Sequence, residues 1–153
     1  MLTYLLKLDS KVKLKNIFEA ISKSKETFIF PLHPRTKKNI EKFNLKIPKN
    51  IKVIEPVGYK KMLSLESNAK KIITDSGGVQ REAYWMRIPC ITLRKETEWV
   101  ETVSDGWSVL VDADTEKIKD AIETFNGNPT GQGLEMPVYG CNKKIREILS
   151  RYI

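Results

Sequence analysis

Short apolar runs alternate with helix-like segments along the chain. Six runs have the length and composition of strands, at residues 2–8, 27–32, 51–56, 70–75, 88–94 and 107–112. One helix face, with i, i+3, i+4, i+7 spacing, is formed by Leu14, Ile17, Phe18 and Ile21. Further helices are expected at residues 36–43, 59–69, 78–87, 115–125 and 143–152. This alternation predicts an α/β fold, a three-layer Rossmann-like parallel sheet with helices on both faces.

The size of the chain favours one compact domain over residues 1–153, and no internal repeat divides it. No apolar run approaches the ~18 residues of a membrane-spanning helix, so no membrane association is predicted. The two cysteines, Cys90 and Cys141, belong to no ligand-like cluster. They favour a reducing, cytoplasmic location, and we expect neither a metal nor a cofactor.

The net charge of +8 comes from lysines spread along the whole sequence. Such spread is typical of a solvated surface, although attraction to nucleic acid or to a phosphate-bearing small molecule is the alternative. Nucleic acid is the weaker alternative, because the lysines form no dense cluster and the aromatic residues show no stacking pattern.

The loop that follows the fourth predicted strand has the composition of a phosphate site. It reads TDSGGVQREA from Thr74 to Ala83, so Ser76, Gly77 and Gly78 lie at the carboxyl end of a strand and at the start of a helix. Ligands bind at such strand ends, glycines allow close approach to the backbone, and helix N-termini favour anions. The alternative is a tight turn in which Ser76 is a simple N-cap.

Glu82 lies one turn into the same helix, among bulky apolar residues. A carboxylate there would pair poorly with a phosphate but could accept two hydroxyls of a ribose beside it. The alternative is an exposed glutamate that stabilises the helix N-terminus by a few tenths of a kcal/mol. The spacing alone leaves both interpretations open.

Several ordered motifs together carry a family resemblance. They are TDSGGVQREA, PLHP with His33, EPVGY ending at Tyr59, the R-x-x-T-E set of Arg94, Thr97 and Glu98, and, more loosely, PVYG at 137–140. From about Lys15 onward the chain resembles the carboxyl-terminal half of the non-hydrolysing UDP-N-acetylglucosamine 2-epimerase family.

That resemblance implies one lobe of a glycosyltransferase-B-like fold, with UDP bound in a cleft. By position in the motifs, the diphosphate would lie on Ser76, Gly77 and Gly78, and the ribose on Glu82. The uracil would be flanked by Tyr59 and Met62, where the family usually has an aromatic residue in place of the methionine. The cleft near the sugar diphosphate would contain His33, Arg94 and Glu98. The alternative for His33 is a histidine satisfied in a turn at the end of a strand.

The family's reaction inverts C2 of a UDP-2-acetamido sugar by eliminating UDP and adding it back. Its acid and base groups belong to an amino-terminal lobe that the resemblance does not include. We therefore expect a truncated isomerase that is inactive as a lone chain. The family resemblance also implies a role in cell-envelope polysaccharide synthesis. The expected partners are UDP or a UDP-2-acetamido sugar, a separate amino-terminal lobe and, because a former cleft wall would be exposed, a second copy of the chain. The alternatives are a freestanding nucleotide-sugar-binding module and a lobe of a glycosyltransferase.

Four departures from the family pattern stand out. Residues 5–9, LLKLD, replace a His-Arg-x-Glu-Asn stretch near the phosphates, and YGCNKK replaces Tyr-Gly-Asp-Gly near the end. Arg81 takes the place of an acid before Glu82. Trp99-Val100 replaces Arg-Pro, which resembles the branch that acts on diacetamido-glucuronic acid nucleotides.

Overall fold

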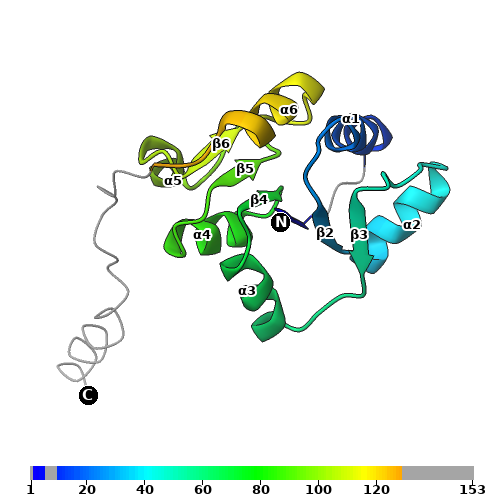
Figure 1. Ribbon diagram of the computed structural model, residues 1–153, viewed down its shortest axis with the longest axis horizontal. Coiled ribbons are helices and arrows are strands. Elements are labelled where there is room, and N and C mark those ends of the chain that lie inside the picture. Colours follow the sequence, from blue (N-terminus) through cyan, green and yellow to red (C-terminus); the bar gives the residue numbers. More distant parts are fainter. Residues whose placement is uncertain (1, 6–9, 129–153) are drawn as a thin grey trace, which may run out of the picture.

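The computed structural model describes residues 2–5 and 10–128 of the chain (Figure 1). Six strands form one sheet in the order β3-β2-β1-β4-β5-β6, and every neighbouring pair is parallel. The strands are β1 (Leu2–Leu5), β2 (Phe28–Pro31), β3 (Ile51–Ile54), β4 (Lys71–Thr74), β5 (Cys90–Thr92) and β6 (Ser108–Leu110). The predicted Rossmann-like α/β fold is confirmed, and its strand order reverses between β1 and β4.

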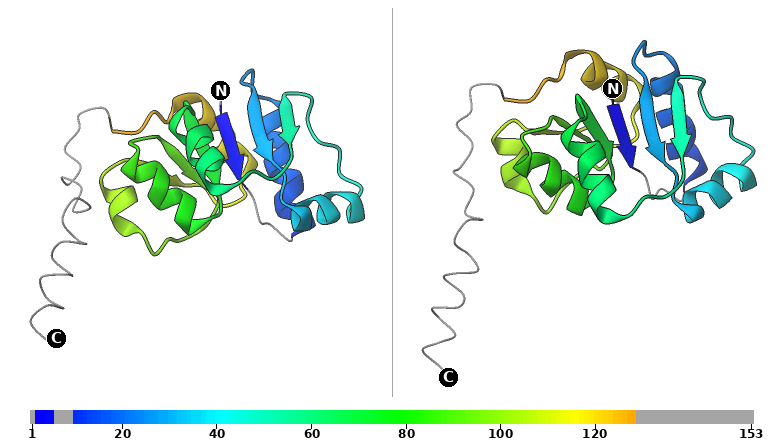
Figure 2. Two further views of the ribbon diagram at one scale, coloured as in Figure 1. Left: turned by 90° about the horizontal axis from the view of Figure 1, so that it is seen from below. Right: turned by 60° about the horizontal axis from the view of Figure 1, so that its bottom comes forward.

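Helices cover both faces of this sheet (Figures 1 and 2). They are α1 (Lys11–Ser22), α2 (Pro34–Lys42), α3 (Tyr59–Ser67), α4 (Gly77–Trp85), α5 (Val100–Ser104) and α6 (Thr115–Thr124). Residues of α1, α2 and α6 share the larger apolar core with the strands. A smaller core around Ile72, Ala83 and Cys90 lies under α3 and α4. These last two helices therefore lie together on the opposite face and define the wall of the site described below.

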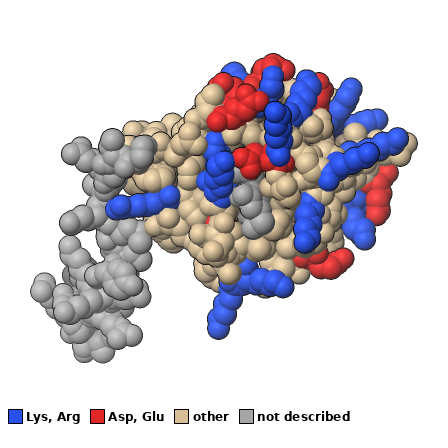
Figure 3. Space-filling model, viewed as in Figure 1, with Lys and Arg blue, Asp and Glu red and all other residues tan. Residues whose placement is uncertain are grey.

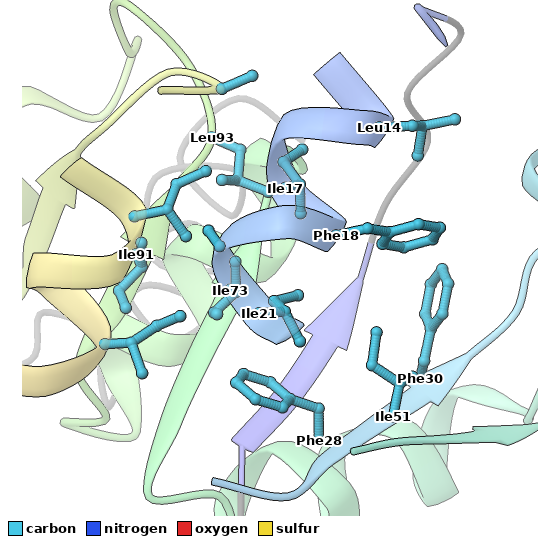
Figure 4. Close-up of a cluster of buried hydrophobic side chains, with 14 of the residues drawn as sticks. Leu14, Ile17, Phe18, Ile21, Phe28, Phe30, Ile51, Ile73, Ile91 and Leu93 are labelled. Atoms are coloured by element: carbon cyan, nitrogen blue, oxygen red, sulfur yellow. The ribbon is translucent and has the colours of Figure 1, made fainter. Parts of the chain in front are cut away.

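Helix α1 shows how the apolar pattern sets the packing. The predicted face of Leu14, Ile17, Phe18 and Ile21 is buried and points toward side chains of the strands (Figure 4). Ser10 caps the helix by accepting a hydrogen bond from the Lys13 N–H at 3.4 Å. The helix thus begins where a capping residue precedes the apolar face.

The observed elements differ from the predicted ones mainly at their ends. The apolar run at 88–94 yields only Cys90–Thr92 as strand, because Ile88 is buried in the turn after α4, where its N–H donates to the Ala83 carbonyl. Helix α5 was not predicted, since five residues are too few to show helical periodicity. The helix expected at 143–152, the PVYG and YGCNKK segments and residues 6–9 lie outside the described residues.

Candidate functional site

The candidate site lies at the carboxyl edge of the sheet, beside the point where the strand order reverses. Chains that leave adjacent parallel strands in opposite directions at such a point open a crevice, and ligands of Rossmann-like folds bind there. Strand β4 ends at Thr74 and leads through Asp75 and Ser76 into α4. The segments after β2 and β3 come to the same edge.

A cleft of about 360 Å³ opens at this edge. Its lining residues are Pro31, His33, Pro56, Val57, Tyr59, Met62, Ser76, Gly78, Val79 and Glu82. The structure therefore brings together six of the nine residues that the sequence suggested for the site. The other three, Gly77, Arg94 and Glu98, lie on the far side of the α4 N-terminus.

The first turn of α4 has no side-chain cap. Ser76 occupies the N-cap position with extended backbone, but its hydroxyl makes no capping hydrogen bond. Its own N–H donates instead to Thr74 Oγ1 at 3.0 Å. Ser76 therefore has the position of an N-cap residue, but the interpretation that its hydroxyl caps the helix is wrong. The N–H groups that Ser76 does not cap and the positive end of the helix dipole can attract an anion from the cleft.

The two adjacent glycines face different surroundings. A Cβ on Gly78 would meet only Ser76 Oγ, at 3.8 Å, so the missing side chain opens this position to the cleft. A Cβ on Gly77 would collide with the carboxylate of Glu98 and would come within 3.1 Å of the indole nitrogen of Trp99. Gly77 therefore makes room for the protein's own side chains, whereas Gly78 makes room in the cleft.

Glu82 is the one carboxylate among the residues that line the cleft. A hydrogen bond to it raises the pKa of Tyr59, the first residue of α3. Tyr59 itself is 65% exposed. Glu82 thus lies beside a hydroxyl group, and a ribose would require it to accept hydrogen bonds from such groups.

Glu66 on α3 was not recognised in the sequence. Its side chain is 0% exposed, and no group of the described residues donates a hydrogen bond to either carboxyl oxygen. Burial first, and then the charge of Glu82, raise the pKa of Glu66 to about 7. Its spacing from Tyr59 and Met62, at i+7 and i+4, places all three on one helix face, but that spacing does not show that the carboxyl group is buried.

The R-x-x-T-E motif approaches α4 from the other side. Arg94 and Glu98 form an ion pair of 2.7 Å, and Arg94 also lines a separate hollow of about 330 Å³ with Lys13 and Asp75. A hydrogen bond from its own backbone N–H lowers the pKa of Glu98. Burial opposes this shift, and the nearby Arg94 guanidinium adds to it, so the pKa stays below its usual range. The pair therefore borders the first turn of α4 without lining the main cleft.

His33 is both a histidine satisfied in a strand-end turn and a residue of the cleft, the two alternatives that the sequence left open. It is the N-cap of α2, and its Nδ1 accepts a hydrogen bond from the Arg35 N–H at 3.2 Å. The same side chain lines the cleft. The strand-end turn thus fixes the ring and leaves it facing the place where a ligand would lie.

On the face shown in Figure 3, lysines and arginines lie at several separate places, some beside acidic residues. None of the helices in the described part of the chain combines the length and apolarity needed to cross a membrane. Residues 2–5 and 10–128 contain no group of three or more His, Cys, Asp or Glu that could hold a metal ion.

The strand order and the cleft beside α4 define a Rossmann-like lobe of the glycosyltransferase-B type. The family model of UDP-N-acetylglucosamine 2-epimerase matches residues 7–150. A UDP-N-acetylglucosamine 2-epimerase homolog from Methanococcus maripaludis is 56% identical over 92% of this chain and 41% of its own length. This chain therefore belongs to the UDP-N-acetylglucosamine 2-epimerase family, as the motifs predicted.

Two further relatives bear on the ligand. The UDP-GlcNAc 2-epimerase of Methanocaldococcus jannaschii, solved in complex with UDP-GlcNAc and UDP, superposes with a TM-score of 0.83 at 41% identity, over 98% of this chain and 45% of that one. The UDP-2,3-diacetamido-2,3-dideoxy-D-glucuronate 2-epimerase of Pseudomonas aeruginosa is 42% identical over 78% of this chain and 34% of its length. The chain thus spans less than half the length of each of these relatives.

Proposed function

We propose that this chain is the UDP-binding lobe of a 2-epimerase that acts on a UDP-2-acetamido sugar. The observation that carries the proposal is the uncapped N-terminus of α4, which opens with Ser76 and Gly78 onto the same cleft as Glu82. An anion-binding helix end and a carboxylate one turn further along match a phosphate and the ribose beside it.

Each part of the nucleotide has a matching surface. The diphosphate lies over the first turn of α4, against Ser76 and Gly78, with His33 across the cleft. The ribose hydroxyls donate to Glu82, the carboxylate beside the Tyr59 hydroxyl. The uracil lies on the apolar part of the cleft, where Met62 and Val57 are.

The reaction needs groups besides those that hold the nucleotide. Moving a proton at a sugar carbon needs an acid and a base of tuned pKa in a closed cleft. Glu82, the cleft carboxylate of the described residues, is assigned to the ribose. We therefore expect a separate amino-terminal lobe to supply the acid and base groups, and we expect no epimerisation by this chain alone. The cytoplasmic location and the role in cell-envelope polysaccharide synthesis remain predictions.

Calorimetric titration of UDP into the purified chain tests the binding. Loss of two hydroxyl contacts to a charged acceptor costs roughly 1.5–3 kcal/mol, so Glu82→Ala should weaken UDP about tenfold or more. The matched control is Glu41→Ala, which removes an exposed carboxylate of α2, away from the cleft. Absence of binding at millimolar UDP, or equal weakening by both variants, would contradict the proposal.

A second assay separates the candidate reactions. The chain is incubated with UDP-GlcNAc in heavy water, and the C2 proton of the sugar is followed by NMR. No exchange is expected from the lone chain, and exchange should appear when an amino-terminal lobe of the family is added. Transfer of the sugar to an added acceptor without C2 exchange would instead identify a glycosyltransferase, and UDP binding with neither reaction would favour a freestanding binding module.

A further inference from the structure

A buried carboxyl group on α3 lies near Glu82, the candidate ribose acceptor. Glu66 is fully buried, and no group of the described residues donates a hydrogen bond to either of its oxygens. An isolated carboxylate is costly to bury, so such a group is held in its neutral, protonated form. A protonated carboxyl has an O–H to donate, which a carboxylate lacks.

Three titratable groups face Glu66. Glu82 comes from α4, Tyr59 from α3 itself and Cys90 from β5. Cys90 is neutral across the physiological range, because burial raises the pKa of its thiol to about 12. No lysine or arginine of the described residues contributes to the raised pKa of Glu66, so only a proton offsets its charge.

We infer that protonated Glu66 is a positioning residue for nucleotide binding, whose carboxyl O–H donates to Glu82 and holds that carboxylate toward the ribose. The inference rests on the proposed function, since it takes Glu82 as the ribose acceptor. Helix α3 then acts on Glu82 twice, through Tyr59 at its first position and through Glu66 at its next-to-last position. When the Glu66 proton passes to solvent, two carboxylates repel each other and Glu82 leaves its binding position.

The consequence is a nucleotide affinity that falls as pH rises through neutrality. If only the protonated form is competent, the apparent dissociation constant equals the intrinsic one divided by the protonated fraction. With a midpoint at about 7, that fraction drops about tenfold between pH 6 and pH 8. The expected ratio of affinities is therefore about ten.

The test measures binding of UDP-GlcNAc at pH 6 and pH 8, because its diphosphate is esterified at both ends and has no proton that titrates in this range. Glu66→Gln keeps an N–H donor but cannot ionise, so its affinity ratio between the two pH values should fall below about twofold. Glu66→Met removes the donor at similar volume and should weaken binding at both pH values. Because histidine ordinarily titrates near this range, the comparison is repeated with His33→Gln present in all proteins.

Each outcome bears on a defined proposal. Equal wild-type affinity at the two pH values, or a tenfold ratio retained in Glu66→Gln, would overturn the positioning role and leave nucleotide binding intact. Absence of UDP-GlcNAc binding at pH 6 would overturn both proposals. The carboxyl ¹³C shift of Glu66 gives a further check in the free chain: a midpoint at about 7 is expected, and one near the ordinary value of about 4.3 would overturn the inference.

Discussion

The buried carboxyl of Glu66 should make the stability of the folded chain fall as pH rises from about 5 to 8. Below the ordinary value of 4.5, the folded and unfolded states both carry the proton, and the group does not distinguish them. Between 4.5 and about 7, the unfolded chain releases the proton while the folded chain keeps it, so unfolding becomes easier. Above about 7 both states are ionised, and this contribution no longer changes.

The size of the effect follows from the two pKa values. Each unit of difference corresponds to about 1.4 kcal/mol. Integrated between pH 5 and pH 8, the free energy of unfolding should fall by about 2.5 kcal/mol in the wild type relative to Glu66→Gln. Other carboxylates with shifted pKa values, such as Glu26 and Asp112, are present in both proteins and cancel in this comparison.

Urea denaturation of both proteins across this pH range provides the measurement, with the midpoint and the m-value recorded at each pH. The two stability profiles should diverge as pH rises, with the wild type losing more. Parallel profiles would refute the reasoning, because they would show that Glu66 has the same proton affinity in both states. A change in m-value would point to altered compactness and not to this linkage.

Four further variants test helix capping, one side-chain hydrogen bond and core packing. Asp114 accepts hydrogen bonds from two backbone N–H groups of α6, at 3.0 and 2.9 Å, so Asp114→Ala should lower the free energy of unfolding by about 1 kcal/mol. Ser10→Ala removes a single capping bond of 3.4 Å and should lower it by less. The hydrogen bond of 2.6 Å from Tyr84 to Asp105 raises the pKa of the phenol to about 12, so Asp105→Asn should move its absorbance titration down toward the usual value. Phe28→Ala removes a fully buried ring, and denaturation should show a loss of roughly 3–5 kcal/mol.

The sequence was sufficient to predict the fold and much of the candidate site. Alternating strand and helix patterns lead to a parallel sheet, and carboxyl ends of neighbouring strands share one edge. Residues after β3 and β4, such as Tyr59 and Ser76, therefore had to lie at the same edge of the sheet, and both line the cleft. Glu82 could be placed there as well, because its spacing from Gly78 puts it on the same face of α4.

Other features depend on contacts that no local pattern reveals. A glutamate in a helix ordinarily indicates a solvated face, so Glu66 could not be recognised as buried without knowing what packs on α3. The difference between Gly77 and Gly78 depends on Glu98 and Trp99, about twenty residues further along the chain. Their side chains occupy the space beside Gly77, which a sequence interpretation assigned to the ligand.

A fully buried glutamine explains how the two motifs cooperate. Gln80 donates to Thr102 at 2.7 Å and accepts from Thr97 at 2.8 Å, so the TDSGGVQ and R-x-x-T-E segments are joined through its amide. This joint holds the loop that carries Glu98 against the Gly77 side of α4 and leaves the Gly78 side open. A buried amide that is hydrogen-bonded to both segments resists their separation, because moving the segments apart would leave the amide and its partners as unpaired buried polar groups. Gln80 thus supports the shape of the cleft without touching it, and the motif combines residues that face a ligand with residues that hold them in place.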